Sequence, residues 1–213
     1  ELIDRGFGIT SKTGTLLRAG LIHMKWDNYE QSIKYFNKNL EVWDKEKGDA
    51  FCRKGTNYTK IGFNYFYKKD FTNASYNFNN AYDFFNQCLQ DFDEEDQSNA
   101  IIAYTWYGLS ELLNGNIDNS TIPINAGESW VQTFPLTSDV NKDYNAYLFY
   151  WPLHLYYKNL NQMDKANNYL KMAYKMVGEQ KIAKYHTHSN KDIYPEFFYC
   201  RDIIKEYESS LKQ

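Results

Sequence analysis

The residue types best suited to metal binding gather near the end of the sequence, where His186, His188 and Asp192 stand close together. Imidazole and carboxylate groups bind zinc, but a structural zinc site takes four ligands at set spacings. Here two histidines two residues apart have neither a cysteine nor a third histidine beside them. We therefore expect no metal ion and no other cofactor.

His154 is a second candidate, because it follows Tyr150, Trp151 and Pro152 in "FYWPLHLYYK". An imidazole among large aromatic side chains could hold a ligand, or it could be a core histidine whose hydrogen bonds are satisfied. We favour the core histidine. A proline removes one helical hydrogen bond, so the sequence predicts that a helix either bends or begins at Pro152.

Cys52, Cys88 and Cys200 are far apart, odd in number and without a C-x-x-C spacing. We predict that they are reduced and mostly buried. The chain has no glycine-rich phosphate loop, nucleophile elbow or zinc-protease helix. Acidic residues of "DFDEEDQSN" are most simply a solvated connection. The sequence therefore favours a protein that is not an enzyme.

Charge and hydropathy exclude two kinds of partner. Lys and Arg number 24 against 27 Asp and Glu, and no basic run stands out, which argues against nucleic acid. No stretch approaches the ~20 apolar residues of a membrane span. The cytoplasm is the default compartment. An exported or lipid-anchored form stays open, because the sequence starts at Glu1 and the native N-terminus is not visible.

The elements that must position these side chains repeat along the chain. From Gly62 to Ala81 the sequence reads G-x2-Y-x5-F-x2-A-x3-F-x2-A, and related patterns begin at Gly20, Gly108 and His154. These four anchor positions are 42, 46 and 46 residues apart, and a further 46 residues leads to Cys200. Within each unit, apolar residues recur at spacings of three and four residues, so each unit is predicted to be a pair of helices.

The small anchor residue lets the second helix of a unit come close, and Ala74 and Ala166 are expected opposite it. Larger side chains at a later position of the pattern are expected to fill the space between successive units: Phe36, Phe78 and Leu170.

This pattern resembles that of the tetratricopeptide repeat (TPR) family. It is matched well by 20–40, 62–82 and 154–174, and only in its first half from 108 onward. The resemblance covers about 14–184, with a period longer than the family's 34 residues, as in long-helix variants. Another family of helical hairpins remains the alternative.

The resemblance implies an all-α solenoid of about four helix pairs in a single domain, 1–213. The expected units and the helix that caps them are 12–50, 51–97, 98–143, 144–184 and 195–212. In the capping helix we expect the charged residues to point away from the apolar stripe: Arg201, Asp202, Lys205, Glu206 and Glu208.

The third unit departs from the pattern after Leu113, where Gly, Pro, Asn and Ser are dense. We expect an irregular insertion over 114–143, with at most a short helix around "AGESWVQTF". It would be either a solvent loop or a lid over a groove.

In TPR arrays the first helices line a concave face, and the resemblance transfers twelve lining positions to this chain. They are Leu17, Leu21, Met24, Thr59, Phe63, Phe66, Thr105, Leu109, Leu112, Trp151, Leu155 and Lys158. This lining is apolar and lacks the Lys, Asn and Arg clamp that some members use for carboxyl-terminal peptides. We therefore expect a scaffold that takes a protein helix or peptide in an apolar groove. The alternatives are a small-molecule or lipid-binding module with 114–143 as its lid, and a groove filled by the chain's own terminal segments.

Overall fold

The computed structural model of this chain describes residues 9–45, 50–88, 94–133, 147–186 and 198–212. These residues form nine α-helices and no strand. The helices are α1 (Ile9–Lys25), α2 (Tyr29–Asp44), α3 (Phe51–Tyr67), α4 (Phe71–Gln87), α5 (Glu94–Leu113), α6 (Ile117–Thr133), α7 (Tyr147–Asn159), α8 (Met163–His186) and α9 (Phe198–Ser210).

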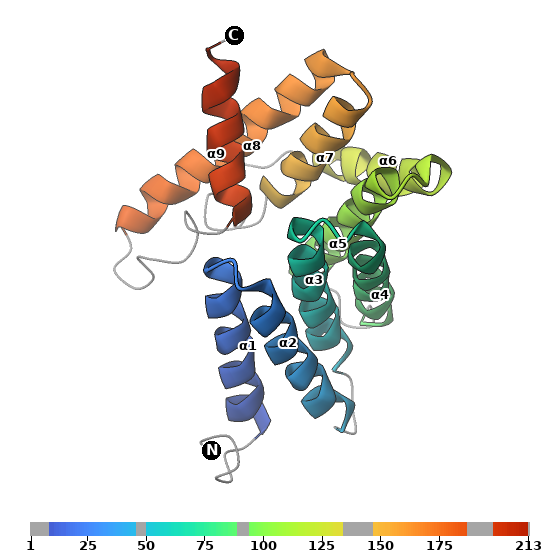
Figure 1. Cartoon of the computed structure of the whole chain (residues 1–213), viewed down its shortest axis with the longest axis vertical. Coiled ribbons are helices and arrows are strands. Elements are labelled where there is room, and N and C mark those ends of the chain that lie inside the picture. Colours follow the sequence, from blue (N-terminus) through green and yellow to red (C-terminus); the bar gives the residue numbers. More distant parts are fainter. Residues whose placement is uncertain (1–8, 46–49, 89–93, 134–146, 187–197, 213) are drawn as a thin grey trace.

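Consecutive helices pack as antiparallel pairs, α1 with α2, α3 with α4, α5 with α6 and α7 with α8 (Figure 1). The second helix of one pair lies against the first helix of the next, as in α2 with α3 and α4 with α5. The fourth pair is joined to the third mainly through α5 and α7, and α9 packs on α8. The predicted all-α, solenoid-like fold with a short C-terminal helix is confirmed.

The turn inside each pair has the same construction. Seven residues after each anchor, one residue adopts a left-handed backbone conformation with φ between 57° and 87°: Asp27, Lys69, Gly115 and Asn161. Its N–H and the next N–H bond back to carbonyls of the first helix, for example Asp27 to Met24 at 3.1 Å and Asn28 to His23 at 2.9 Å. This is the Schellman way of ending a helix. The second helix then begins two residues later in all four pairs.

The third pair corrects the prediction of an irregular insertion. Residues 117–133 form α6, the regular second helix of the pair, and 134–143 lies outside the described residues. Pro123 is buried inside α6, where its ring lies against the anchor Gly108. Ser120 and Gly127 are both buried, so small residues stand at the positions that Ala74 and Ala81 occupy in the second pair. The prediction from local composition was wrong because Ser120, Pro123 and Gly127 allow close packing of two helices and do not mark an irregular loop.

The anchor glycines make a contact that the sequence did not predict. A methyl group on Gly20 would lie 2.7 Å from the ring of Phe36, and one on Gly62 would lie 2.8 Å from the ring of Phe78. The phenylalanine rings thus cover the glycine of their own pair. Phe78 also reaches the next pair, where its ring centroid lies 5.9 Å from that of Trp106, as expected for this position. Ala166 lies opposite its anchor, since its carbonyl is 2.9 Å from Nδ1 of His154.

Trp106 and Trp151 donate hydrogen bonds to residues of other helix pairs. Pro152 has no N–H to give to Leu148, and the Trp106 indole N–H donates to that carbonyl instead, at 2.9 Å. α7 already begins five residues before Pro152, so the helix does not start at the proline. Trp151 donates from its indole nitrogen to the Tyr67 hydroxyl at 3.3 Å. Helices α3 and α7 therefore touch across the intervening pair, and the array curls tightly.

The cysteine prediction was wrong for two of the three residues. Cys52 at the start of α3 and Cys88 at the end of α4 form a disulfide, with their Cα atoms 5.4 Å apart. An antiparallel pair brings its first and last turns together, which sequence spacing alone did not indicate. Cys200 is buried, as expected.

Candidate functional site

The twelve predicted lining residues do not form an open groove. Seven of them are buried: Met24, Thr59, Phe63, Phe66, Thr105, Leu109 and Trp151. The other five are partly exposed: Leu17, Leu21, Leu112, Leu155 and Lys158.

Phe63 shows why the groove prediction fails in the middle of the array. Its ring is fully buried and makes edge contacts with Phe78 and Trp106, at centroid distances of 5.3 and 4.9 Å. The tight curl brings successive first helices together, so these apolar side chains pack into one core.

The last helix, α9, packs on α8 of the fourth pair, on the side that faces the first pair. We call this side the inner side of the fourth pair. Cys200 and Ile203 are buried, three residues apart on one face of α9. One turn further along, the Tyr207 ring stacks on Tyr174 of α8 with centroids 3.9 Å apart. Residues at i, i+3 and i+7 thus form the stripe by which an amphipathic helix docks on a surface.

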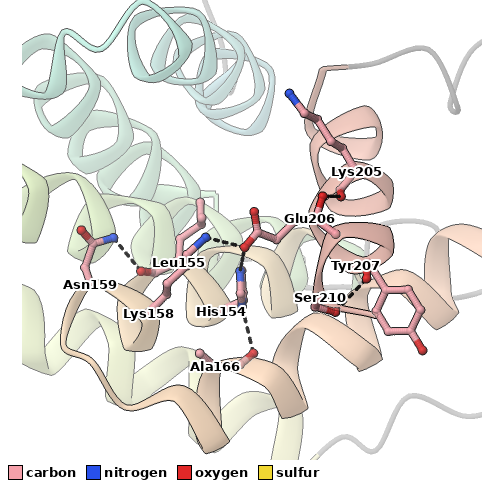
Figure 2. Close-up of polar contacts among 10 residues, drawn as sticks. His154, Leu155, Lys158, Asn159, Ala166, Lys205, Glu206, Tyr207 and Ser210 are labelled. Atoms are coloured by element: carbon pink, nitrogen blue, oxygen red, sulfur yellow. Dashed lines mark hydrogen bonds and ion pairs between the residues drawn. The ribbon is translucent and has the colours of Figure 1, made fainter. Parts of the chain in front are cut away.

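Two charged contacts flank this stripe. Glu206 of α9 accepts from the Lys158 ammonium of α7, one of the predicted lining residues, as Figure 2 shows. Arg201 donates to Asp27 in the turn between α1 and α2 at 2.6 Å. We had expected Glu206 and Arg201 to point away from the apolar stripe as solvent-facing residues of a cap. Instead, both bond to residues of other parts of the array. Helix α9 spans from the fourth pair to the first.

His154 lies beneath Glu206 and is a core histidine, as predicted, but only one of its two ring nitrogens has the expected hydrogen bond. It is 1% exposed, its ring stacks on Trp151, and its Nδ1 lies 2.9 Å from the Ala166 carbonyl. Its Nε2 has no hydrogen-bond partner in the structure and lies 3.9 Å from the Glu206 carboxylate. Burial lowers the pKa of His154, against the opposing influence of the Ala166 carbonyl and Glu206. The neutral ring therefore donates from Nδ1.

No cluster of three potential metal ligands occurs among the described residues. Of the faint metal candidate, His188 and Asp192 lie outside the described residues, and the side chain of His186 is not described. None of the described helices is both long and apolar enough to cross a membrane.

Sequence reasoning named the chain's own terminal segments only as one alternative occupant of the groove and did not predict the individual α9 contacts, although one signal pointed to them. The register of 46 residues places Cys200 at an anchor position, and this residue is indeed buried on the contact face. The acceptor Asp27 and the stacking partner Tyr174 carried no such signal, because they are brought close by the curl of the array.

Comparisons with known proteins do not assign the chain to a family. No family model matches the sequence. No curated protein matches it either.

Proposed function

We propose that this protein is a non-enzymatic, TPR-like binding module that holds an amphipathic helix of a partner protein on the inner side of its fourth pair. The observation that carries the proposal is the seat of α9, where Cys200 and Ile203 are buried and Tyr207 stacks on Tyr174. The same surface offers Lys158 for an acidic side chain of the bound helix.

In this proposal α9 is the occupant in the free protein, and the partner helix replaces it. The two flanking ion pairs are partly exposed, and exposed pairs contribute little to stability. Most of the free energy that keeps α9 bound then comes from its short apolar stripe. A partner helix with a better-fitting apolar stripe can bind more tightly and replace it.

The test uses a labelled peptide of residues 198–213. We expect it to bind more tightly to the full-length variant Ile203→Glu than to the wild type, because a buried carboxylate expels the variant's own α9. Lys205→Glu, an exposed change on the same helix, is the matched control and should leave binding at the wild-type level. Circular dichroism checks that both variants stay helical. A folded Ile203→Glu variant that does not bind the peptide would contradict the proposal.

The lipid or small-molecule alternative has lost its main support. Its lid was the stretch 114–143, and residues 117–133 of that stretch form the packed helix α6.

The Cys52–Cys88 disulfide bears on the compartment. Such bonds persist in oxidising compartments and are rare in the cytosol. We therefore favour an oxidising compartment over the cytoplasmic default. Alkylation and mass spectrometry of protein isolated without reductant should find these two cysteines unmodified.

A further inference from the structure

Three positions of each pair, two in the first helix and one directly after it, include residues that contact the preceding pair in the array. They lie two residues before, two after and six after the anchor. In the second pair, the last of these is Lys68, which pairs with Glu30 of α2. In the third pair it is Asn114, which accepts from Thr72 of α4 at 2.9 Å. The fourth pair uses the middle position, where Tyr156 lies 3.4 Å from Ser120 of α6, hydroxyl to hydroxyl.

The first two of these positions are mostly buried where a preceding pair exists, whereas Lys68 and Asn114 at the last position are exposed. Among them, Asn64, Trp106, Ser110 and Tyr156 are at most 5% exposed. In the first pair the same three positions are Arg18, Ile22 and Trp26. Arg18 is exposed, and Ile22 and Trp26 are 48% and 70% exposed.

Helix α1 stands at the outer edge of the array, with α2 between it and α3 (Figure 1). Among the described helices, only α2 packs extensively along it. At the other end of the array, α9 covers α8 and shows polar residues such as Lys205 and Glu208 to solvent. The α1 edge instead presents a tryptophan and an isoleucine.

The charge on this edge indicates what covers it. Lys12 lies at the register position of Lys54, which pairs with Asp44 of α2 at 2.6 Å. Neither Lys12 nor Arg18 has an ion pair among the described residues, and α1 contains no Asp or Glu. A second copy of α1 would therefore meet like charge, whereas an acidic helix would be attracted.

We infer that the edge formed by Arg18, Ile22 and Trp26, with Lys12 below it, binds an acidic amphipathic helix of a partner protein. That helix runs antiparallel to α1 and takes the place that α2 has against α3. Glu30 and Asp44 mark the two ends of the α2 contact. The partner thus carries an apolar residue at the position of Glu30, against Trp26. It carries a carboxylate at the position of Asp44, against Lys12.

The probe is a helix-locked, fluorescently labelled peptide with the sequence of residues 28–45 and the single change Glu30→Leu. It is titrated with the full-length protein and followed by anisotropy. We expect binding that Trp26→Glu weakens about tenfold or more, since buried aromatic anchors dominate helix docking. Lys12→Glu should weaken it too, and added salt should lower the affinity.

Two matched controls make the result specific. Ile122→Glu changes another side chain that is 70% exposed, on α6, and should leave the affinity unchanged. A second peptide that also carries Asp44→Lys should bind the wild type more weakly than the probe. No binding at about 1 mM protein would overturn the inference, and so would binding that Trp26→Glu leaves intact. Both outcomes leave the α9 seat untouched, because that surface is tested with a different peptide.

Discussion

Trp106 connects three parts of the core through a single side chain. Its ring contacts Phe66 and Phe78 at centroid distances of 5.0 and 5.9 Å. Its N–H donates to the Leu148 carbonyl, to which Pro152 has no N–H to donate. We predict that Trp106→Phe lowers the free energy of unfolding by about 1–3 kcal/mol, because a buried carbonyl is left without a donor. Urea unfolding measures the difference.

Trp26→Phe is the matched control, since Trp26 is 70% exposed. It should change stability by less than about 0.5 kcal/mol. If both variants lose the same free energy of unfolding, the hydrogen bond from Trp106 to Leu148 does not contribute to stability.

His154 predicts a dependence of stability on pH. Burial holds its pKa below the usual value near 6.5, while Glu206 raises it and Lys158 lowers it. Below about pH 6.5 the unfolded histidine binds a proton that the folded one resists, so its contribution to stability is present above that pH and lost as the pH falls. We expect His154→Gln to lose less stability than the wild type between pH 7 and pH 5. Parallel pH profiles from thermal melts would contradict this.

At the scale of the helix pair, Gly108 sets how closely α5 and α6 approach. A methyl group there would lie 2.7 Å from Pro123 and 2.9 Å from the backbone carbonyl of Ser120. Backbone cannot rotate away as a side chain can, so Gly108→Ala should cost about 1–3 kcal/mol. Gly14→Ala, on α1 with open space around it, should instead stabilise by about 0.5–1 kcal/mol. Thermal melts that rank the two variants in the opposite order would refute the packing assignment.

The disulfide joins the outer ends of α3 and α4 across 36 residues of sequence. We predict that Cys52→Ser with Cys88→Ser lowers the free energy of unfolding by about 2–4 kcal/mol, mainly by releasing the unfolded chain. A reductant should destabilise the wild type by a similar amount and leave the double variant unchanged. If the reductant destabilises both proteins equally, its effect on stability does not come from this disulfide.

How far the sequence predicts this protein also differs between elements. The 42–46-residue register was sufficient for the paired helices, because close packing demands small residues at fixed places. It failed over 114–133, where Pro123 and Gly127 were interpreted by their propensity and not by their register. The disulfide and the α9 contacts depend on how far the pairs curl. That curl is set by side chains such as Trp151 and Tyr67, which are 84 residues apart in sequence.

For the whole molecule, the curl decides which surface is free for binding. The predicted lining became core in the middle pairs, with Phe63 and Leu109 fully buried. The lining residues that stay partly exposed lie mostly in the first and fourth pairs: Leu17, Leu21, Leu155 and Lys158. The two surfaces that we propose for binding, the α9 seat and the α1 edge, lie at these two ends. A change of either buried residue to Lys should therefore unfold the chain, as measured by circular dichroism, because a buried ammonium has no partner there.

The bond from Arg201 to Asp27 joins residues 174 positions apart. In an open repeat array each unit touches only its neighbours, so the terminal units fray first and protect their amides least. Here the last helix is fastened to the first turn, and α3 is fastened to α7. Because the Arg201–Asp27 pair is partly exposed, this closure is weak, and displacement of α9 should speed amide exchange at the turn between α1 and α2 only slightly.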